Sequence, residues 1–173
     1  QQARLTPWLL NFAVCAIAFH GIAVYGMIFT PVGFNFGFFT ALTFIFFTVN
    51  ALVLISSLKK PLHTLFVFLF PLSAASLACA LMIPADNAPL ENISGAIALH
   101  ILLSVIAYSL LTIAALQAMV LAYQNYKLHR RQLNGVIRVL PPLQTMEQLL
   151  FELLWLGEII LTLAIATGFI FLE

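Results

Sequence analysis

Long apolar segments alternate with short polar ones along the whole chain. Five segments reach the roughly 20 residues that an α-helix needs to cross the hydrocarbon core of a bilayer. They are Pro7–Phe29, Phe34–Leu58, Leu62–Ile83, Gly95–Tyr126 and Glu147–Leu172. Backbone polar groups in hydrocarbon must be satisfied within the segment, which favours helices. The pattern therefore predicts an all-α bundle of about five transmembrane helices, forming a single domain over residues 1–173.

The breaks between these segments hold residues typical of turns and helix ends. Thr30-Pro31-Val32-Gly33 separates the first two segments, and Lys59-Lys60-Pro61 separates the next two. At the start of the fifth segment, Thr145 and Gln148 have the spacing of a capping box, in which each side chain bonds the other residue's backbone amide. We expect this pair to open the fifth helix.

The composition excludes a water-soluble globular protein. Hydrophobic residues make up 63% of the 173 positions and charged residues only 8%, which is too few to cover a water-facing surface. Seven Lys and Arg oppose six Asp and Glu, so net charge gives no reason to expect a nucleic acid partner. Cys15 and Cys79 both lie within apolar segments, and we expect them to pack as small hydrophobic residues.

The basic residues predict the orientation. If the helices alternate in direction, all seven fall on the same side of the membrane: Arg4, Lys59, Lys60, Lys127, Arg130, Arg131 and Arg138. The loops on the other side contain Asp86 and Glu91 instead. Because positive charge is enriched in cytoplasmic loops, we expect a cytoplasmic N-terminus and an outer Glu173.

The candidate chemistry lies within the membrane. The sequence shows no glycine-rich phosphate loop, no zinc-ligand cluster and no nucleophile paired with a base, so we expect no enzymatic activity. Ionisable residues inside a membrane are costly and are often functional. We predict that three such residues lie inside the membrane: His20, His100 and Glu158.

His20 and His100 are predicted to lie at similar depths in the outer half of the membrane. At 1.5 Å per residue they lie about 13 Å and 8 Å below the outer surface. Neutral imidazole is a good ligand for haem iron, and helical bundles can build such sites from facing helices. The alternative is that each histidine hydrogen-bonds a neighbouring helix and stabilises the bundle. His63 and His129 lie beside basic residues and are expected to be solvated.

Several other residues of the apolar segments have two interpretations each. The phenylalanines of the second segment could line a porphyrin pocket or face lipid: Phe34, Phe36, Phe38, Phe39, Phe44, Phe46 and Phe47. Asn50 is expected to bond to a neighbouring helix. Glu158 falls near mid-membrane, where a carboxylate must be neutral, paired or hydrated. It either packs in its protonated form or makes a polar contact with a ligand, water or another helix.

Two stretches resemble the cytochrome c assembly protein family of haem-handling membrane proteins. The first is Leu99-His100-Ile101-Leu102-Leu103-Ser104-Val105-Ile106-Ala107-Tyr108, followed by Ala114-Ala115-Leu116-Gln117-Ala118. The second is Leu140-Pro141-Pro142-Leu143-Gln144-Thr145-Met146-Glu147, followed by Gly157 and by Leu161-Thr162-Leu163-Ala164-Ile165-Ala166-Thr167-Gly168. The short HemX-like or YpjD-like inner-membrane branch is the most similar.

The resemblance implies haem binding near the outer face of a bacterial plasma membrane, in service of cytochrome maturation or haem homeostasis. His100 matches the family's haem-liganding histidine, and His20 matches a histidine of the short branch. The implied partners are the lipid bilayer, haem and other cytochrome-assembly or membrane proteins. The tryptophan-rich outer motif of the larger members does not occur in this sequence, and Glu158 stands where the family usually has an apolar residue.

Two other functions remain open from the sequence. The chain could be a non-catalytic partner or regulatory subunit that binds no cofactor. It could also be a small-solute transporter with Glu158 as a proton-coupled carboxylate, although no internal repeat supports transport.

Overall fold

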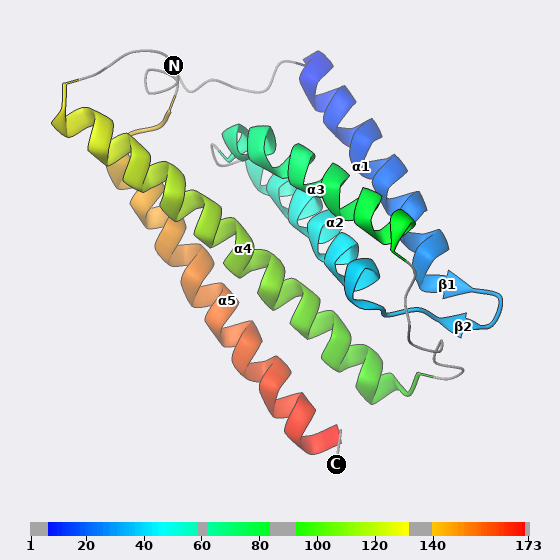
Figure 1. Ribbon diagram of the computed structural model, residues 1–173. Helices are drawn as coiled ribbons and strands as arrows, with labels where there is room; N and C mark the ends of the chain where they lie inside the picture. Colours follow the sequence, from blue (N-terminus) through cyan, green and yellow to red (C-terminus); the bar gives the residue numbers. More distant parts are fainter. Residues whose placement is uncertain (1–6, 59–61, 84–92, 132–139, 172–173) are drawn as a thin grey trace.

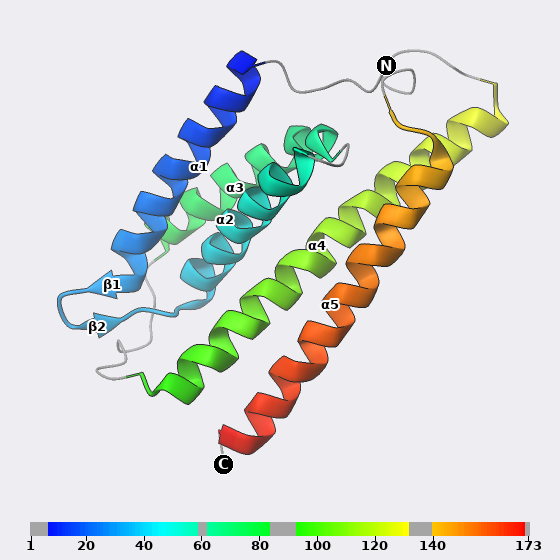
Figure 2. The same cartoon turned by 180° about the vertical axis from the view of Figure 1, so that it is seen from behind.

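Five α-helices make up most of the described structure, a computed structural model that describes residues 7–58, 62–83, 93–131 and 140–171 (Figures 1 and 2). They are α1 (Pro7–Ile28), α2 (Phe38–Ser57), α3 (Phe66–Met82), α4 (Gly95–His129) and α5 (Leu143–Phe171). Four of them are long and apolar enough to cross a membrane, and α3 is apolar but has 17 residues. The predicted all-α membrane bundle is thereby confirmed.

A short β-hairpin joins α1 to α2 at the Thr30–Gly33 turn. Strand β1 (Phe29–Thr30) pairs antiparallel with β2 (Gly33–Phe34). Thr30 Oγ1 donates to the Gly33 carbonyl at 2.7 Å. Gly33 has a φ of 135°, which residues other than glycine rarely adopt. The first helix therefore ends before Phe29, and the second begins at Phe38 rather than Phe34. The hairpin and its side-chain hydrogen bond override the apolar pattern locally.

The helices divide into two groups that run roughly parallel to one another. α4 and α5 form a long antiparallel pair, while α1, α2 and α3 lie together on the other side, with α2 in contact with α4 (Figures 1 and 2). One end of the bundle, here called the hairpin end, holds β1–β2, the start of α4 and the end of α5. The opposite end, here called the basic end, holds the last turn of α4 with Lys127 and His129.

The apolar core lies where α2, α3 and α4 meet. Val49 and Val53 of α2, Leu69 of α3 and Ile113 of α4 are at most 1% exposed. A short 3-10 helix, η1 (His63–Leu65), leads into α3 and adds Leu65 to this core. The other sides of the helices expose large apolar side chains, as expected where lipid replaces water.

Small residues bring α4 and α5 close together. Ala107 and Ala114 of α4 and Gly157 and Ala164 of α5 are all buried. Small side chains let helix backbones approach in membranes, where packing rather than the hydrophobic effect drives association. α4 has 35 residues and is about 52 Å long at 1.5 Å per residue. It therefore exceeds a hydrocarbon core of about 30 Å.

The predicted capping box at the start of α5 is wrong. α5 begins at Leu143, and the backbone amides of Thr145 and Met146 donate to the Pro142 carbonyl at 3.0 and 3.2 Å. Thr145 thus already lies inside the first turn. The Pro141-Pro142 pair starts the helix earlier, because proline fits the first positions of a helix without losing a hydrogen bond.

Candidate functional site

His100 lies in the second turn of α4, at the hairpin end, and faces α5. Its Nδ1 is 3.0 Å from the Ala164 carbonyl oxygen and 3.3 Å from Thr167 Oγ1. A carbonyl oxygen only accepts, so Nδ1 carries the proton and donates it to Ala164. In the neutral ring the lone pair is then on Nε2, the form in which imidazole binds metal ions.

Thr167 and Gly168 complete the support of this ring. Thr167 Oγ1 donates to the same Ala164 carbonyl at 2.7 Å, so its lone pairs remain available to Nδ1–H. A β-carbon on Gly168 would lie 3.1 Å from His100 Cε1 and 3.5 Å from Nδ1, which is tight for the first contact. Because glycine has no side chain, the His100 imidazole can pack directly against α5 at Gly168.

His20 lies on α1 and faces α2. Its ring meets the Phe47 ring edge-on, with the centroids 5.9 Å apart and an interplanar angle of 79°. Its Nε2 is buried and has no hydrogen-bond partner among the described residues. A buried polar atom without a partner is uncommon and suggests a water, a ligand or an ion that the nitrogen can contact.

The two histidines lie at the same end of the bundle but on different helix pairs. His20 packs at the α1–α2 contact, and His100 packs at the α4–α5 contact. α1 and α4 make no extensive contact with each other. Joint coordination of one iron by both residues therefore stays a prediction, with His100 in the better-defined environment.

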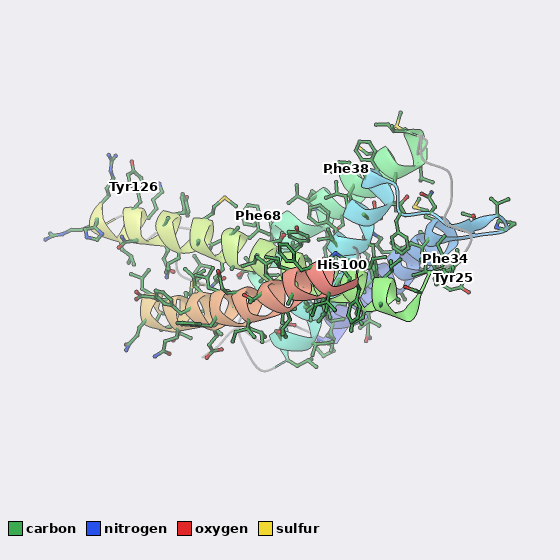
Figure 3. All side chains as sticks on the ribbon, turned by 90° about the horizontal axis from the view of Figure 1, so that it is seen from below. Tyr25, Phe34, Phe38, Phe68, His100 and Tyr126 are labelled. Carbon is green, nitrogen blue, oxygen red and sulfur yellow. The ribbon has the colours of Figure 1, made fainter. Side chains whose placement is uncertain are left out.

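An aromatic cavity of about 520 Å³ lies beside these histidines at the hairpin end. Its walls come from α1, the hairpin, α2 and the first turns of α4, and most of its lining is apolar. Figure 3 shows two of its residues, Tyr25 and Phe34, together near the hairpin, and His100 beside α5. Neither histidine lines the cavity.

The phenylalanine cluster is divided between a cavity and the outer surface, and its role in binding a porphyrin stays a prediction. Four of its members line the cavity: Phe34, Phe36, Phe44 and Phe47. Phe38 instead is 74% exposed on the outer surface, where lipid would surround it.

The remaining candidate ligands do not gather into a metal site. His129 is exposed and donates from Nδ1 to the Asn125 carbonyl of its own helix at 2.9 Å. The side chain of His63 lies outside the described residues. Cys15 is exposed and Cys79 partly buried, and both are free thiols. Within the described ranges, no three His, Cys, Asp or Glu residues come close enough to hold a metal ion.

Glu158 points away from the bundle. It lies in the middle of α5, and its side chain is exposed. Its backbone carbonyl accepts from Thr162 Oγ1 at 2.8 Å, whereas its carboxylate takes part in no hydrogen bond or ion pair with the residues described here. The described helices therefore offer Glu158 no partner, and both interpretations, protonated packing and a polar contact, stay predictions.

Sequence reasoning missed the residues that hold His100. Ala164, Thr167 and Gly168 all lie in the second stretch that carries the family resemblance, but neither spacing nor composition assigned them a role. The small residues at 164 and 168, one helical turn apart, were the available signal for a close approach by another helix.

Comparisons with known proteins bear on the same stretches. The family model described as "Cytochrome C assembly protein" matches residues 8–173. The chain belongs to this family. The inner membrane protein YpjD of Escherichia coli K12 is 32% identical over 98 residues, as are its counterparts in strains CFT073 and O157:H7. The matched region covers 57% of this chain and 37% of each relative's length. No solved structure matches the chain.

Proposed function

We propose that this cytochrome c assembly family member binds haem and serves cytochrome maturation or haem homeostasis in the bacterial inner membrane. The observation that carries the proposal is the hydrogen bond from His100 Nδ1 to the Ala164 carbonyl, 3.0 Å long. This bond leaves Nε2 as the nitrogen with a free lone pair, which suits an axial ligand of haem iron. Family membership over residues 8–173 supports a haem-related role.

The surroundings of His100 and His20 suit a role as ligands of haem iron. Metal-bound histidines commonly donate their other ring N–H to a carbonyl or carboxylate, which fixes the ring and makes the bound nitrogen more basic. In this protein the Ala164 carbonyl accepts the hydrogen bond from His100 Nδ1. His20 is the second candidate ligand, because its buried Nε2 lacks a partner among the described residues.

The protein in this proposal is not itself an enzyme. Haem iron supplies the coordination and redox chemistry, and the protein supplies binding, orientation and exclusion of water. Thr167 and Ala164 hold the tautomer of His100, and Gly168 leaves room for its ring. The apolar surroundings near the hairpin end suit a largely apolar porphyrin.

The relatives and the charges support the proposed location. YpjD is described as an inner membrane protein, and the basic residues predict a cytoplasmic N-terminus and an outer Glu173. Glu173 and most of the basic residues lie outside the described residues. Lys127, Arg130 and Arg131 do lie at the basic end of the bundle, so the hairpin end with both histidines would face outward.

The test is the visible spectrum of the protein purified with haem and of four histidine variants. We expect a Soret band that His100→Ala weakens at least several-fold, because the iron would lose the imidazole nitrogen that His100 would supply. His20→Ala should weaken it less, and His63→Ala and His129→Ala should leave it unchanged. Four identical spectra would contradict the ligand assignment, and no haem in the wild type would contradict the proposed function.

A further inference from the structure

The outward face of α5 is polar in a way that lipid does not explain. Viewed along the helix, the side opposite α4 exposes Gln144, Gln148, Trp155, Glu158 and Thr162. Residues 144, 148, 151, 155 and 159 follow the three- and four-residue spacing of a single helix face and line a shallow groove along it. This face therefore has both a groove that another helix could contact and side chains that can form hydrogen bonds.

α5 is an edge helix in the described structure. Its extensive contact is with α4, through Met146, Leu149, Gly157 and Ala164. Glu158 lies about one third of a turn from Gly157 on the helix, on the side that faces away from α4. In a membrane that side meets either lipid or a further helix.

A carboxylate at this depth is costly against lipid. Glu158 lies near the middle of a 29-residue apolar helix. Ionisable side chains in transmembrane segments generally face a protein interior or water and pair with another polar group. The exposed Glu158 therefore indicates that this face is covered by protein, and that the covering helix offers a group to the carboxylate.

The composition of α5 argues against a second copy of the same face. α5 contains no Lys or Arg, while Glu147 and Glu158 lie exposed on the same side of it. Two such faces in symmetric contact would place acidic groups opposite one another, which destabilises the pair. Charge complementarity favours a different helix, one with a cationic side chain.

We propose that the outward face of α5 is a docking site for a further transmembrane helix that presents a Lys or Arg side chain to Glu158. Trp155, which is 69% exposed and one turn from Glu158, would pack at the centre of this contact. Gln148 and Thr162 would hydrogen-bond the same helix on either side. This inference is independent of haem binding.

A defined peptide tests the proposal in proteoliposomes that contain the intact protein. The probe is a polyleucine transmembrane peptide with one central Lys and a coumarin acceptor, and the matched control peptide has Leu in place of Lys. A Trp8→Phe background leaves Trp155 as the donor for energy transfer. We expect the Lys peptide to bind about five- to thirty-fold more tightly than the Leu peptide, as for other polar contacts between membrane helices.

Substitutions at exposed positions decide whether the site is this face. Glu158→Leu should remove the preference for the Lys peptide, and Glu158→Gln should reduce it. In the double variant Glu158→Leu, Leu163→Glu, the carboxylate moves to another exposed position of α5, about 140° around the helix. Loss of the preference in this variant supports a site built around Glu158, whereas full retention would overturn it. Energy transfer to an acceptor-labelled second copy of the chain, unaffected by the Lys peptide, would also overturn the proposal.

Discussion

At the scale of single residues, the hydrogen bond from His100 to Ala164 is the most informative contact in the molecule. It joins residues 64 positions apart and determines which ring nitrogen has the lone pair. The position of His100 near the start of its helix could be predicted from the sequence, because it follows from counting residues after the polar break. Its partner could not be predicted, because every residue has a backbone carbonyl and the residue type does not show which one accepts the bond.

Substitution of Gly168 tests the environment of His100 directly. Gly168→Ala would place a β-carbon 3.1 Å from Cε1, so the ring must shift by a few tenths of an ångström. We expect haem affinity to fall about tenfold while the protein remains folded, the lower end of the 10- to 100-fold range for changes around a metal-bound residue. The measurement is a haem titration followed by the Soret band.

Gly26→Ala is the matched control for this change. Nothing lies within 4 Å of a β-carbon at Gly26, so the same chemical change meets open space. It should leave haem affinity unaltered and stabilise α1 slightly, because alanine favours helix over glycine. A Gly168→Ala variant with wild-type affinity would show that the tight contact does not position the ring.

At the scale of helices, α2 and α3 are joined by a buried polar contact. Asn50 Nδ2 donates to Ser73 Oγ at 2.6 Å and to the Phe46 carbonyl at 2.8 Å. The expectation that Asn50 bonds to a neighbouring helix is confirmed. The sequence did not identify Ser73 as its partner, because a serine is common in apolar segments and does not by itself indicate a contact with another helix.

A double-mutant cycle on Asn50 and Ser73 measures this contact. We expect Asn50→Ala and Ser73→Ala to be coupled by about 0.6 kcal/mol and by no more than about 1.7 kcal/mol, the range found for hydrogen bonds between membrane helices. The measurement is the free energy of unfolding in detergent micelles. Strictly additive effects would indicate that α2 and α3 do not pair at these residues.

The contact between α4 and α5 depends on Gly157. A β-carbon at this position would lie 2.9 Å from Leu111 Cδ2 and 3.1 Å from Leu111 Cγ. Gly157→Val adds two further carbons to this contact, so we expect it to destabilise the protein by about 1–3 kcal/mol through overpacking. Gly26→Val changes the same residue type in open space and serves as the control in the same unfolding assay.

The sequence predicts the helices better than it predicts their ends. Apolar length alone indicated the bundle, since a bilayer permits few alternatives to a helix. The starts of α2 and α5 were misplaced because local chemistry determines them: Asn35 Oδ1 accepts from the Gly37 amide at 2.9 Å before α2, and the Pro142 carbonyl accepts the first amides of α5. These contacts form only once the chain has turned.

At the scale of the whole molecule, the two ends of the bundle differ in chemistry. The hairpin end contains the aromatic cavity, His20 and His100, and the described part of the basic end contains Lys127, Arg130 and Arg131. Lys127 and Arg130 also lie over the rings of Tyr123 and Tyr126, at 5.8 and 4.6 Å from their centroids. Such aromatic and basic residues are typical of a membrane–water interface on the cytoplasmic side.

This polarity leads to a prediction about topology. Val32 is 71% exposed at the tip of the hairpin, and His129 is exposed at the last turn of α4, at the opposite end of the bundle. In a background with Cys15→Ala and Cys79→Ala, we expect Val32→Cys to react with an impermeant maleimide on intact spheroplasts. His129→Cys should react only after permeabilisation, because the basic residues beside it predict a cytoplasmic location for that end. Both variants belong to the same protein in the same membrane, so each controls for the expression of the other and for access of the reagent.

Reaction of His129→Cys from outside, with Val32→Cys protected, would show that the orientation is the reverse of the predicted one. His20 and His100 would then lie near the cytoplasmic face.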